Sequence, residues 1–248
     1  MKKAIHFMCM GLVLWGSSIL PAKEQKTDPK AAQVLEKMIE AQGGREALAA
    51  IRDMTLSGSM ELVQMGLEGN VTIFQKEPDK MRLDIEIMGM VISQAYDGKT
   101  AWFLNPQTGA NEEMPEQMAA DMRRQAMGND ALLNPQKYNI TYTYEGTDTV
   151  EGREHHVLKQ HYPDGYTAAF YLDSKTFYLT KTKSMTINQM GMEVETENYQ
   201  SDFRQVDSIG LVMPFAMTTY QEKEEFMTMT VDDVRFNTGI DDSKFKMN

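Results

Sequence analysis

The chain has 248 residues, of which 42% are hydrophobic and 25% are charged. This composition is typical of one large globular domain and excludes a protein with many membrane-spanning helices. The 25 lysines and arginines stand against 36 aspartates and glutamates, for a net charge of −11. Such a chain repels phosphate backbones, which argues against nucleic-acid binding. Methionine is unusually frequent, with 22 residues beside two tryptophans and one cysteine.

Residues 1–22 have the pattern of a secretory signal peptide. Lys2 and Lys3 precede an uncharged, mostly apolar stretch over residues 4–20, and we expect cleavage after Ala22. A membrane anchor is the alternative, but two serines and a proline leave fewer than the roughly 20 apolar residues that span a bilayer. Cleavage would remove Cys9 and leave an acidic exported domain, residues 23–248, with 19 methionines and no disulfide.

The exported part is predicted to begin with a helix. Thr27 or Asp28 would cap this helix, Pro29 would occupy its first position, and the glycine pair at 43–44 would end it. Between these signals, apolar residues recur at helical spacing, as in Ala31, Val34, Leu35, Met38 and Ile39. A short second helix is expected over residues 47–51, after which the apolar period changes from 3.6 to 2.

Alternation of apolar and polar residues then predicts a mainly β protein. One face of residues 54–62 carries Met54, Leu56, Met60 and Leu62, and one face of residues 81–87 carries Met81, Leu83 and Ile85. Turn signals separate further runs near residues 139–144, 155–161, 166–172, 177–187, 192–199, 211–220 and 226–236. We expect about eleven antiparallel strands in a single α+β domain, forming a sandwich or barrel.

A helix is predicted to interrupt the strands over residues 111–129. Met114, Met118 and Met122 recur every four residues there, and acidic and basic side chains occupy the opposite face. Two interpretations are open. The helix is either ordinary core that plugs one end of a barrel, or a lid over an apolar cavity, for which flexible and polarisable methionine is well suited.

Catalytic and metal-binding patterns are weak in this sequence. His155, His156 and His161 lie on one expected strand, but a zinc site needs three or four converging ligands, so we expect these histidines to face solvent. Glu193, Glu195 and Glu197 are spaced to share a solvated strand face. No glycine-rich phosphate loop or nucleophile elbow is present. We therefore predict no metal, no cofactor and no enzyme activity, with a histidine-dependent secreted hydrolase as the alternative.

Three segments occur in an order that is typical of one family of exported proteins. A Lys-x-Pro turn over residues 76–78 is followed by an Asp-Gly-Lys-Thr hairpin at 97–100 and a Trp-Phe-x-Asn-Pro stretch at 102–106. Residues 199–207 are similar to the C-terminal strands of outer-membrane lipoprotein-sorting proteins. Together these segments resemble the LolA-like family of periplasmic lipoprotein carriers.

The resemblance implies an unclosed antiparallel β-barrel with an N-terminal helix and a helical lid, as in LolA and LolB. It further implies a monomer whose concave face shelters lipoprotein acyl chains or other lipids, and transport proteins of the inner and outer membranes as partners. A lipid- or lipoprotein-sensing module of the same fold is the alternative. The candidate cavity and lid residues are Met54, Leu56, Met60, Leu62, Met81, Leu83, Ile85, Trp102, Met114, Met118 and Met122.

One position departs from the family pattern. Carriers of this kind usually have an arginine before the proline of the Lys-x-Pro turn, where it tethers the lid, and this chain has Glu77 there. Lys76 and Arg82 are the candidate replacements for that arginine.

Overall fold

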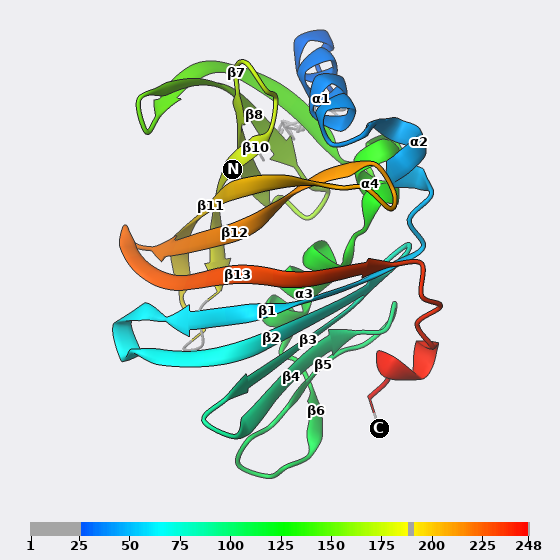
Figure 1. Cartoon of the computed structure of the whole chain (residues 1–248), viewed down its shortest axis with the longest axis vertical. Helices are drawn as coiled ribbons and strands as arrows, with labels where there is room; N and C mark the ends of the chain where they lie inside the picture. Colours follow the sequence, from blue (N-terminus) through cyan, green and yellow to red (C-terminus); the bar gives the residue numbers. More distant parts are fainter. Residues whose placement is uncertain (1–25, 188–190, 248) are drawn as a thin grey trace, which may run out of the picture.

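The computed structural model describes residues 26–187 and 191–247, so the predicted signal peptide lies outside the described residues. An antiparallel sheet of thirteen strands forms the body of the protein (Figure 1). The strands are β1 (Asp53–Leu62), β2 (Leu67–Lys76), β3 (Lys80–Ile87), β4 (Met90–Tyr96), β5 (Ala101–Leu104), β6 (Asn111–Glu113), β7 (Thr141–Val150), β8 (Arg153–His161), β9 (Thr167–Asp173), β10 (Leu179–Ile187), β11 (Glu193–Val206), β12 (Leu211–Gln221) and β13 (Glu224–Phe236).

The sheet curls into an unclosed barrel, as the sequence predicted. The spatial order is β6-β5-β4-β3-β2-β1-β13-β12-β11-β10-β9-β8-β7, and its two edge strands, β6 and β7, are not paired with each other in the described part of the chain. The structure has thirteen strands instead of about eleven. The strands for which no alternating run was identified are β2, β4, β5 and β6, and the last two have only four and three residues.

Two helices at the N-terminal end follow the prediction. They are α1 (Pro29–Ala41) and α2 (Gly44–Ala49). The Asp28 carboxylate accepts hydrogen bonds from Ala31 N at 2.6 Å and from Tyr144 N at 2.7 Å, so the residue that caps α1 also attaches it to β7. Gly43 has a φ of +120°, and a Cβ there would lie 2.6 Å from the Gly210 carbonyl oxygen. Glycine is therefore required where the turn between the helices packs on the start of β12.

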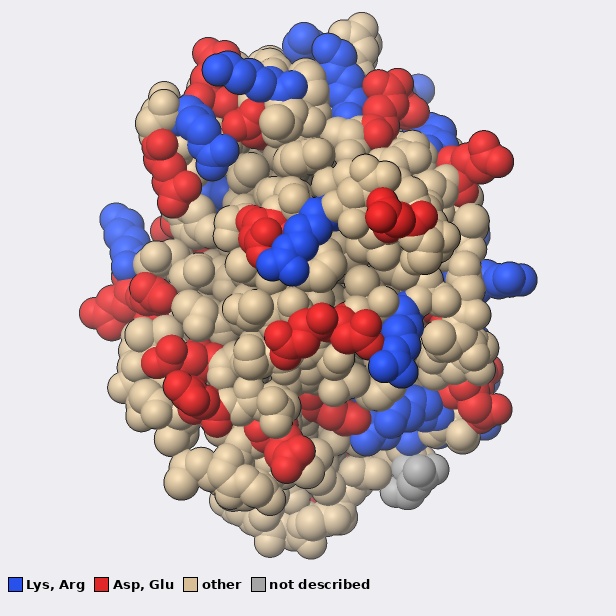
Figure 2. Space-filling model, in the orientation of Figure 1, with Lys and Arg blue, Asp and Glu red and all other residues tan. Residues whose placement is uncertain are grey.

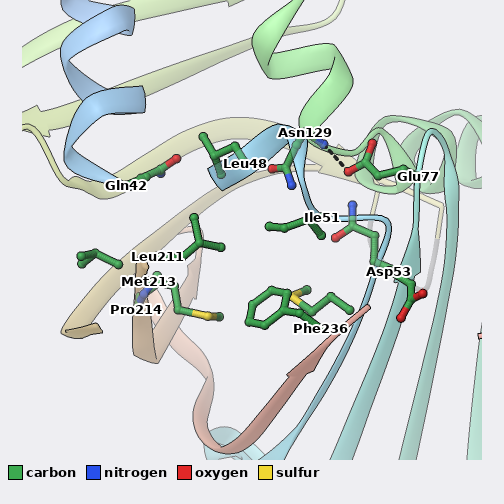
Figure 3. A pocket seen from close by; sticks show the side chains of 13 residues that line it. Gln42, Leu48, Ile51, Asp53, Glu77, Asn129, Leu211, Met213, Pro214 and Phe236 are labelled. Atoms are coloured by element: carbon green, nitrogen blue, oxygen red, sulfur yellow. Dashed lines mark hydrogen bonds between the residues drawn. The ribbon is translucent and has the colours of Figure 1, made fainter. Parts of the chain in front are cut away.

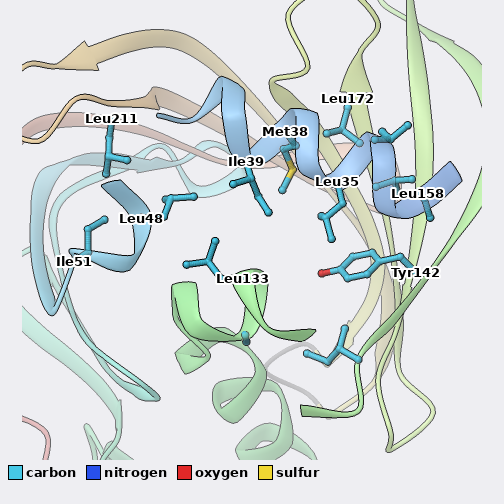
Figure 4. Packing of buried hydrophobic residues seen from close by; sticks show 14 residues of the cluster. Leu35, Met38, Ile39, Leu48, Ile51, Leu133, Tyr142, Leu158, Leu172 and Leu211 are labelled. Carbon is cyan, nitrogen blue, oxygen red and sulfur yellow. The ribbon is translucent and has the colours of Figure 1, made fainter. Parts of the chain in front are cut away.

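The main apolar core lies where these helices meet β7–β9 and α4 (Asn129–Leu133). Side chains from the three helices point toward one another in Figure 4, with Leu133 of α4 directed at α1 and α2. Tyr142 is fully buried and its hydroxyl accepts a hydrogen bond from Gln160 Nε2 at 2.7 Å, which satisfies the polar end of the ring. Burial raises the pKa of this phenol above its ordinary value.

The methionine-rich helix, α3 (Glu116–Ala126), is shorter than predicted. Residues 111–113 pair with β5 as an edge strand, and the helix begins only after Pro115, whose ring fits a helix start but not a helix interior. The helix contacts β3, β4 and β5 on one side and β10 on the other. It therefore crosses between the two halves of the curled sheet (Figure 1).

The described chain ends on the outer side of the sheet, after the 3-10 turn η3 (Asp242–Lys244). Two further 3-10 turns, η1 (Val63–Met65) and η2 (Pro135–Tyr138), connect elements elsewhere. Phe245 is completely buried, and its carbonyl oxygen accepts a hydrogen bond from Trp102 Nε1 at 2.7 Å. Lys76 and Arg82 also bind this segment, through the Asp242 carboxylate at 2.7 Å and the Lys244 carbonyl at 3.1 Å. Neither of these two basic residues therefore replaces the lid-tethering arginine.

Candidate ligand-binding cavity

The concave face of the sheet and α3 enclose a cavity of about 610 Å³. Its apolar wall comes from β1, β2, β3, β13 and α3, whose inward-facing residues follow the period of two along each strand. Eight methionines line it: Met60, Met81, Met114, Met118, Met122, Met217, Met227 and Met229. Others lie outside it on exposed turns, such as Met65 and Met88. Flexible thioether side chains thus form much of the surface that a ligand would contact.

Most of the predicted cavity and lid residues lie together. Seven line the cavity: Met60, Met81, Leu83, Ile85, Met114, Met118 and Met122. Leu56 and Leu62 belong to the adjoining apolar cluster. Met54 lines a separate, smaller pocket. Trp102 does not line the cavity, because its ring lies beneath the C-terminal segment and stacks against Arg82 at 5.5 Å.

A polar wall faces the apolar one, and the sequence analysis missed it. Its uncharged side chains come from three neighbouring strands, β10, β11 and β12: Thr182, Ser184, Thr186, Thr196, Asn198, Gln200 and Thr219. Charged residues of β10 and β11 alternate with them and face outward, where Lys181 pairs with Glu197 and Lys183 with Glu195, both at 2.9 Å. A sequence signal did exist, because charged and uncharged polar residues alternate with period two in residues 181–184 and 195–198.

Two charged residues of α3 attach the helix to the β8–β10 side of the barrel. Arg124 pairs with Asp121 and with Asp164, and its guanidinium lies 4.1 Å from the centre of the Tyr166 ring. Asp121 also accepts a hydrogen bond from Ile187 N at 3.3 Å. On the opposite side, α3 is held by apolar packing of Met122 and its neighbours against β4 and β5. The helix is therefore held at one edge by the Arg124–Asp164 ion pair and the Asp121–Ile187 hydrogen bond, and at the other by apolar contacts.

Glu77 anchors the segment that follows α3. Its carboxylate accepts hydrogen bonds from Asn129 N at 2.7 Å and Asp130 N at 3.3 Å, at the start of α4 (Figure 3). A Cβ at Gly128 would clash with this carboxylate, so glycine permits the close approach. Burial, the largest effect, raises the pKa of Glu77, while the two N–H groups act in the opposite direction. An acidic residue thus binds the segment that follows α3, at the position where LolA-like carriers usually have arginine.

Replacing Glu77 by glutamine is expected to leave the protein at least as stable at neutral pH. The amide oxygen still accepts from Asn129 N, and no charge is buried. The pKa of Glu77 in the folded state is raised above its ordinary value of 4.5. The neutral carboxyl therefore makes its whole contribution to the free energy of unfolding below pH 4.5, and this contribution is lost as the pH rises through the raised pKa. In urea unfolding, the free energy of unfolding of the wild type should therefore rise relative to that of Glu77→Gln as the pH falls from neutral to 4.5. A fall in the wild-type value relative to the variant over that pH range would contradict the raised pKa of Glu77.

A smaller pocket of about 170 Å³ lies beside Glu77, at the α2 end of the barrel. Leu48 and Ile51 line it from the α2 region, and Met54, Leu211 and Phe236 from the sheet (Figure 3). The apolar cluster that contains Leu56 lies between this pocket and Met60 along the inner face of β1. The smaller pocket therefore extends the apolar inner surface beyond the main cavity.

The histidines are arranged differently from the expectation. His155 does not face solvent but is completely buried, with Nδ1 2.9 Å from the Arg153 carbonyl oxygen and no hydrogen-bond partner for Nε2 in the described residues. The expectation of a solvent-facing side chain was therefore wrong for His155. His156 stacks on Phe177, and His161 contacts Thr143. Within residues 26–187 and 191–247, no three histidine, cysteine, aspartate or glutamate side chains are grouped as metal ligands.

The surface is mixed in charge. Figure 2 shows acidic and basic side chains interspersed over one face, without a continuous basic patch on it. None of the helices in the described part of the chain is both long enough and apolar enough to cross a bilayer.

Comparison with solved structures identifies the fold. An outer membrane lipoprotein-sorting protein domain from Vibrio parahaemolyticus aligns with a TM-score of 0.57 at 13% identity, covering 86% of this chain and 96% of its own. A DUF1329 family protein from Desulfovibrio piger aligns with a TM-score of 0.59 at 13% identity over 89% and 98%. A LolA superfamily protein from Nitrosomonas europaea aligns with a TM-score of 0.57 at 11% identity, covering 87% of this chain and 97% of its own. The chain thus shares the open β-barrel fold of these three proteins, one of which is a LolA superfamily protein, and the predicted fold is confirmed.

Comparison of the sequence with protein-family models gives no match. No curated protein matches it either. The fold is therefore recognised through its geometry.

Proposed function

We propose that the protein is a periplasmic carrier that shelters the acyl chains of a lipoprotein or another lipid and delivers them toward the outer membrane. The observation that carries this proposal is the methionine-lined cavity between the concave sheet and α3. The fold shared with a lipoprotein-sorting domain and a LolA superfamily protein supports it. In this account the protein acts by binding and has no catalytic residues.

The energetics of binding an acyl chain are favourable in such a cavity. Each methylene moved out of water contributes about 0.8 kcal/mol, so a dozen contribute roughly 10 kcal/mol before the ordering costs of binding. A loosely fitting cavity is sufficient because this term depends on buried area more than on exact shape. The eight cavity methionines suit chains of variable length and branching.

Loading and release require α3 to move. Arg124 holds one edge of this helix through its ion pair with Asp164, and Asp121 through its hydrogen bond with Ile187 N. Glu77 holds the segment behind the helix through hydrogen bonds. We propose that α3 is the lid, that these contacts stabilise its closed position, and that transport proteins in the inner and outer membranes bind states in which it is displaced. The protein would act as a monomer with its signal peptide removed.

A sensor of mislocalised lipids or lipoproteins is the second candidate. The same cavity supports it, because a sensor and a carrier need the same apolar surface. A carrier must pass its ligand to an acceptor membrane, whereas a sensor only needs to change its binding to a protein partner. Transfer of bound ligand from the protein to acceptor vesicles distinguishes the two.

Uptake of a fluorescent N-acylated lipopeptide by the delipidated protein tests the proposal. We expect saturable binding of one ligand per chain, with the fluorophore shielded from an aqueous quencher. The unacylated peptide is the matched control and should not bind. Protein that is folded by circular dichroism yet fails to bind the lipopeptide would contradict the proposed function.

A further inference from the structure

The two walls of the cavity differ in chemistry. Met60, Leu83 and their neighbours form an apolar wall, whereas the wall on β10–β12 carries mainly uncharged hydrogen-bonding side chains such as Thr196 and Asn198. The apolar residues on this second wall are Ile187 and Met217. A cavity built for hydrocarbon alone has no use for the polar wall, because each hydrogen-bonding group covered by an acyl chain loses its water. The polar wall therefore indicates a ligand that is itself polar on one side.

The polar wall is an ordered hydrogen-bonded network. Thr219 Oγ1 donates to Asn198 Oδ1 at 2.8 Å, and Asn198 Nδ2 donates to Thr182 Oγ1 at 3.3 Å. Thr186 and Thr196 share a second bond at 2.6 Å between their hydroxyl oxygens. An amide has two donor hydrogens and an oxygen with two lone pairs, and each hydroxyl has one donor and two acceptor sites. The network therefore has capacity left for both a donor and an acceptor on a ligand.

Charges are excluded from this wall. Along β10 and β11, Lys181, Lys183, Glu195 and Glu197 all face outward and pair with one another there. The two charged residues that line the cavity, Asp121 and Arg124, pair with each other. Arg124 is further neutralised by Asp164. Among the described residues that line it, the cavity thus offers hydrogen bonds but no unpaired cation that would balance the charge of an anionic ligand.

We infer that the ligand is an acyl lipid whose polar part enters the cavity and is uncharged, as in an ester, an amide or a hydroxyl group, and is not a carboxylate or phosphate. This inference rests on the proposed lipid-binding function. Acyl chains would lie on the methionine wall, while the neutral linkage would hydrogen-bond to Asn198 and its neighbours on β10–β12.

Binding measurements with a fixed hexadecanoyl chain and varied polar groups test this inference. We expect monopalmitoylglycerol and N-palmitoylethanolamine to bind at least about tenfold more tightly than palmitate or palmitoyl lysophosphatidylglycerol at neutral pH, as expected for an uncompensated charge in a cavity. Equal or tighter binding of the two anions would overturn it. If none of the four lipids binds, and diphenylhexatriene, an uncharged hydrocarbon probe, does not bind either, the proposed function fails instead.

Variants of the polar wall provide an independent test. Asn198→Leu and the near-isosteric Thr219→Val should weaken binding of N-palmitoylethanolamine by about threefold to tenfold, the range expected for one hydrogen bond. Binding of diphenylhexatriene should be unchanged, which also reports that the variants are folded. Thr218→Val is the matched control, because Thr218 is adjacent in sequence but lies outside the cavity on β12. Unchanged affinity for the amide lipid in Thr219→Val and Asn198→Leu would contradict the inference.

Discussion

Replacing Leu83 by aspartate is expected to weaken binding of an N-acylated lipopeptide by at least about 30-fold. Leu83 lines the apolar wall and is only partly buried, so the fold tolerates a polar replacement there better than at Met60, which is 5% exposed. Loss of one leucine contact is worth about 2 kcal/mol, which is about 30-fold in affinity, and a carboxylate facing an acyl chain adds a desolvation penalty. Fluorescence titration of the lipopeptide measures the effect.

The matched control is Val91→Asp. Val91 is 49% exposed and pairs with Glu86 on the outward face of the β3–β4 hairpin. Val91→Asp places the same carboxylate in the same hairpin. The affinity of this variant for the lipopeptide should therefore stay within about twofold of wild type, a difference of less than about 0.5 kcal/mol. Unchanged affinity in folded Leu83→Asp would remove the apolar wall from the binding site. The double variant Met60→Asp and Leu83→Asp is expected to abolish uptake.

Replacing Phe245 by alanine is expected to destabilise the protein by about 3–5 kcal/mol, as for other buried aromatic side chains. Phe245 is completely buried, and its carbonyl oxygen is the acceptor for Trp102 Nε1. Loss of the ring opens a cavity on the outer side of the sheet and loosens the contact that covers Trp102. Urea unfolding followed by tryptophan fluorescence measures both changes.

Met247→Ala provides the comparison for Phe245→Ala. Met247 lies two residues further along the same segment and is 40% exposed, so its replacement should change stability by less than about 0.5 kcal/mol. Under conditions in which both variants are folded, their affinity for the lipopeptide should be the same, because the C-terminal segment packs on the face of the sheet opposite the cavity. A loss of affinity without a loss of stability in Phe245→Ala would contradict the placement of Trp102 outside the binding site.

Sequence reasoning succeeded where a pattern was long. In β1 and β3 the alternation runs for eight or more residues, so it identified Met60, Leu83 and Ile85 as one inward face. The cap at Asp28 and the proline after it likewise fixed the start of α1, because both depend on local backbone chemistry.

Prediction from the sequence failed where tertiary packing decides which way a side chain faces. β5 has four residues and apolar side chains on both faces, so nothing local shows that Trp102 turns toward the C-terminal segment. His155 is completely buried, and no pattern in the surrounding sequence of β8 predicts that burial. The polar wall was missed for a different reason. A search for apolar positions passes over Thr196 and Asn198, although their alternation with outward charges was visible.

The account depends most on the claim that the cavity holds an acyl lipid in the protein's native setting. Native mass spectrometry of the protein purified from its own compartment without detergent tests this claim directly. We predict a population heavier than the apo protein by the mass of one acylated molecule, which is released on denaturation and is reduced in Leu83→Asp. A spectrum with apo protein alone, or with a bound species that has no acyl chain, would contradict the account.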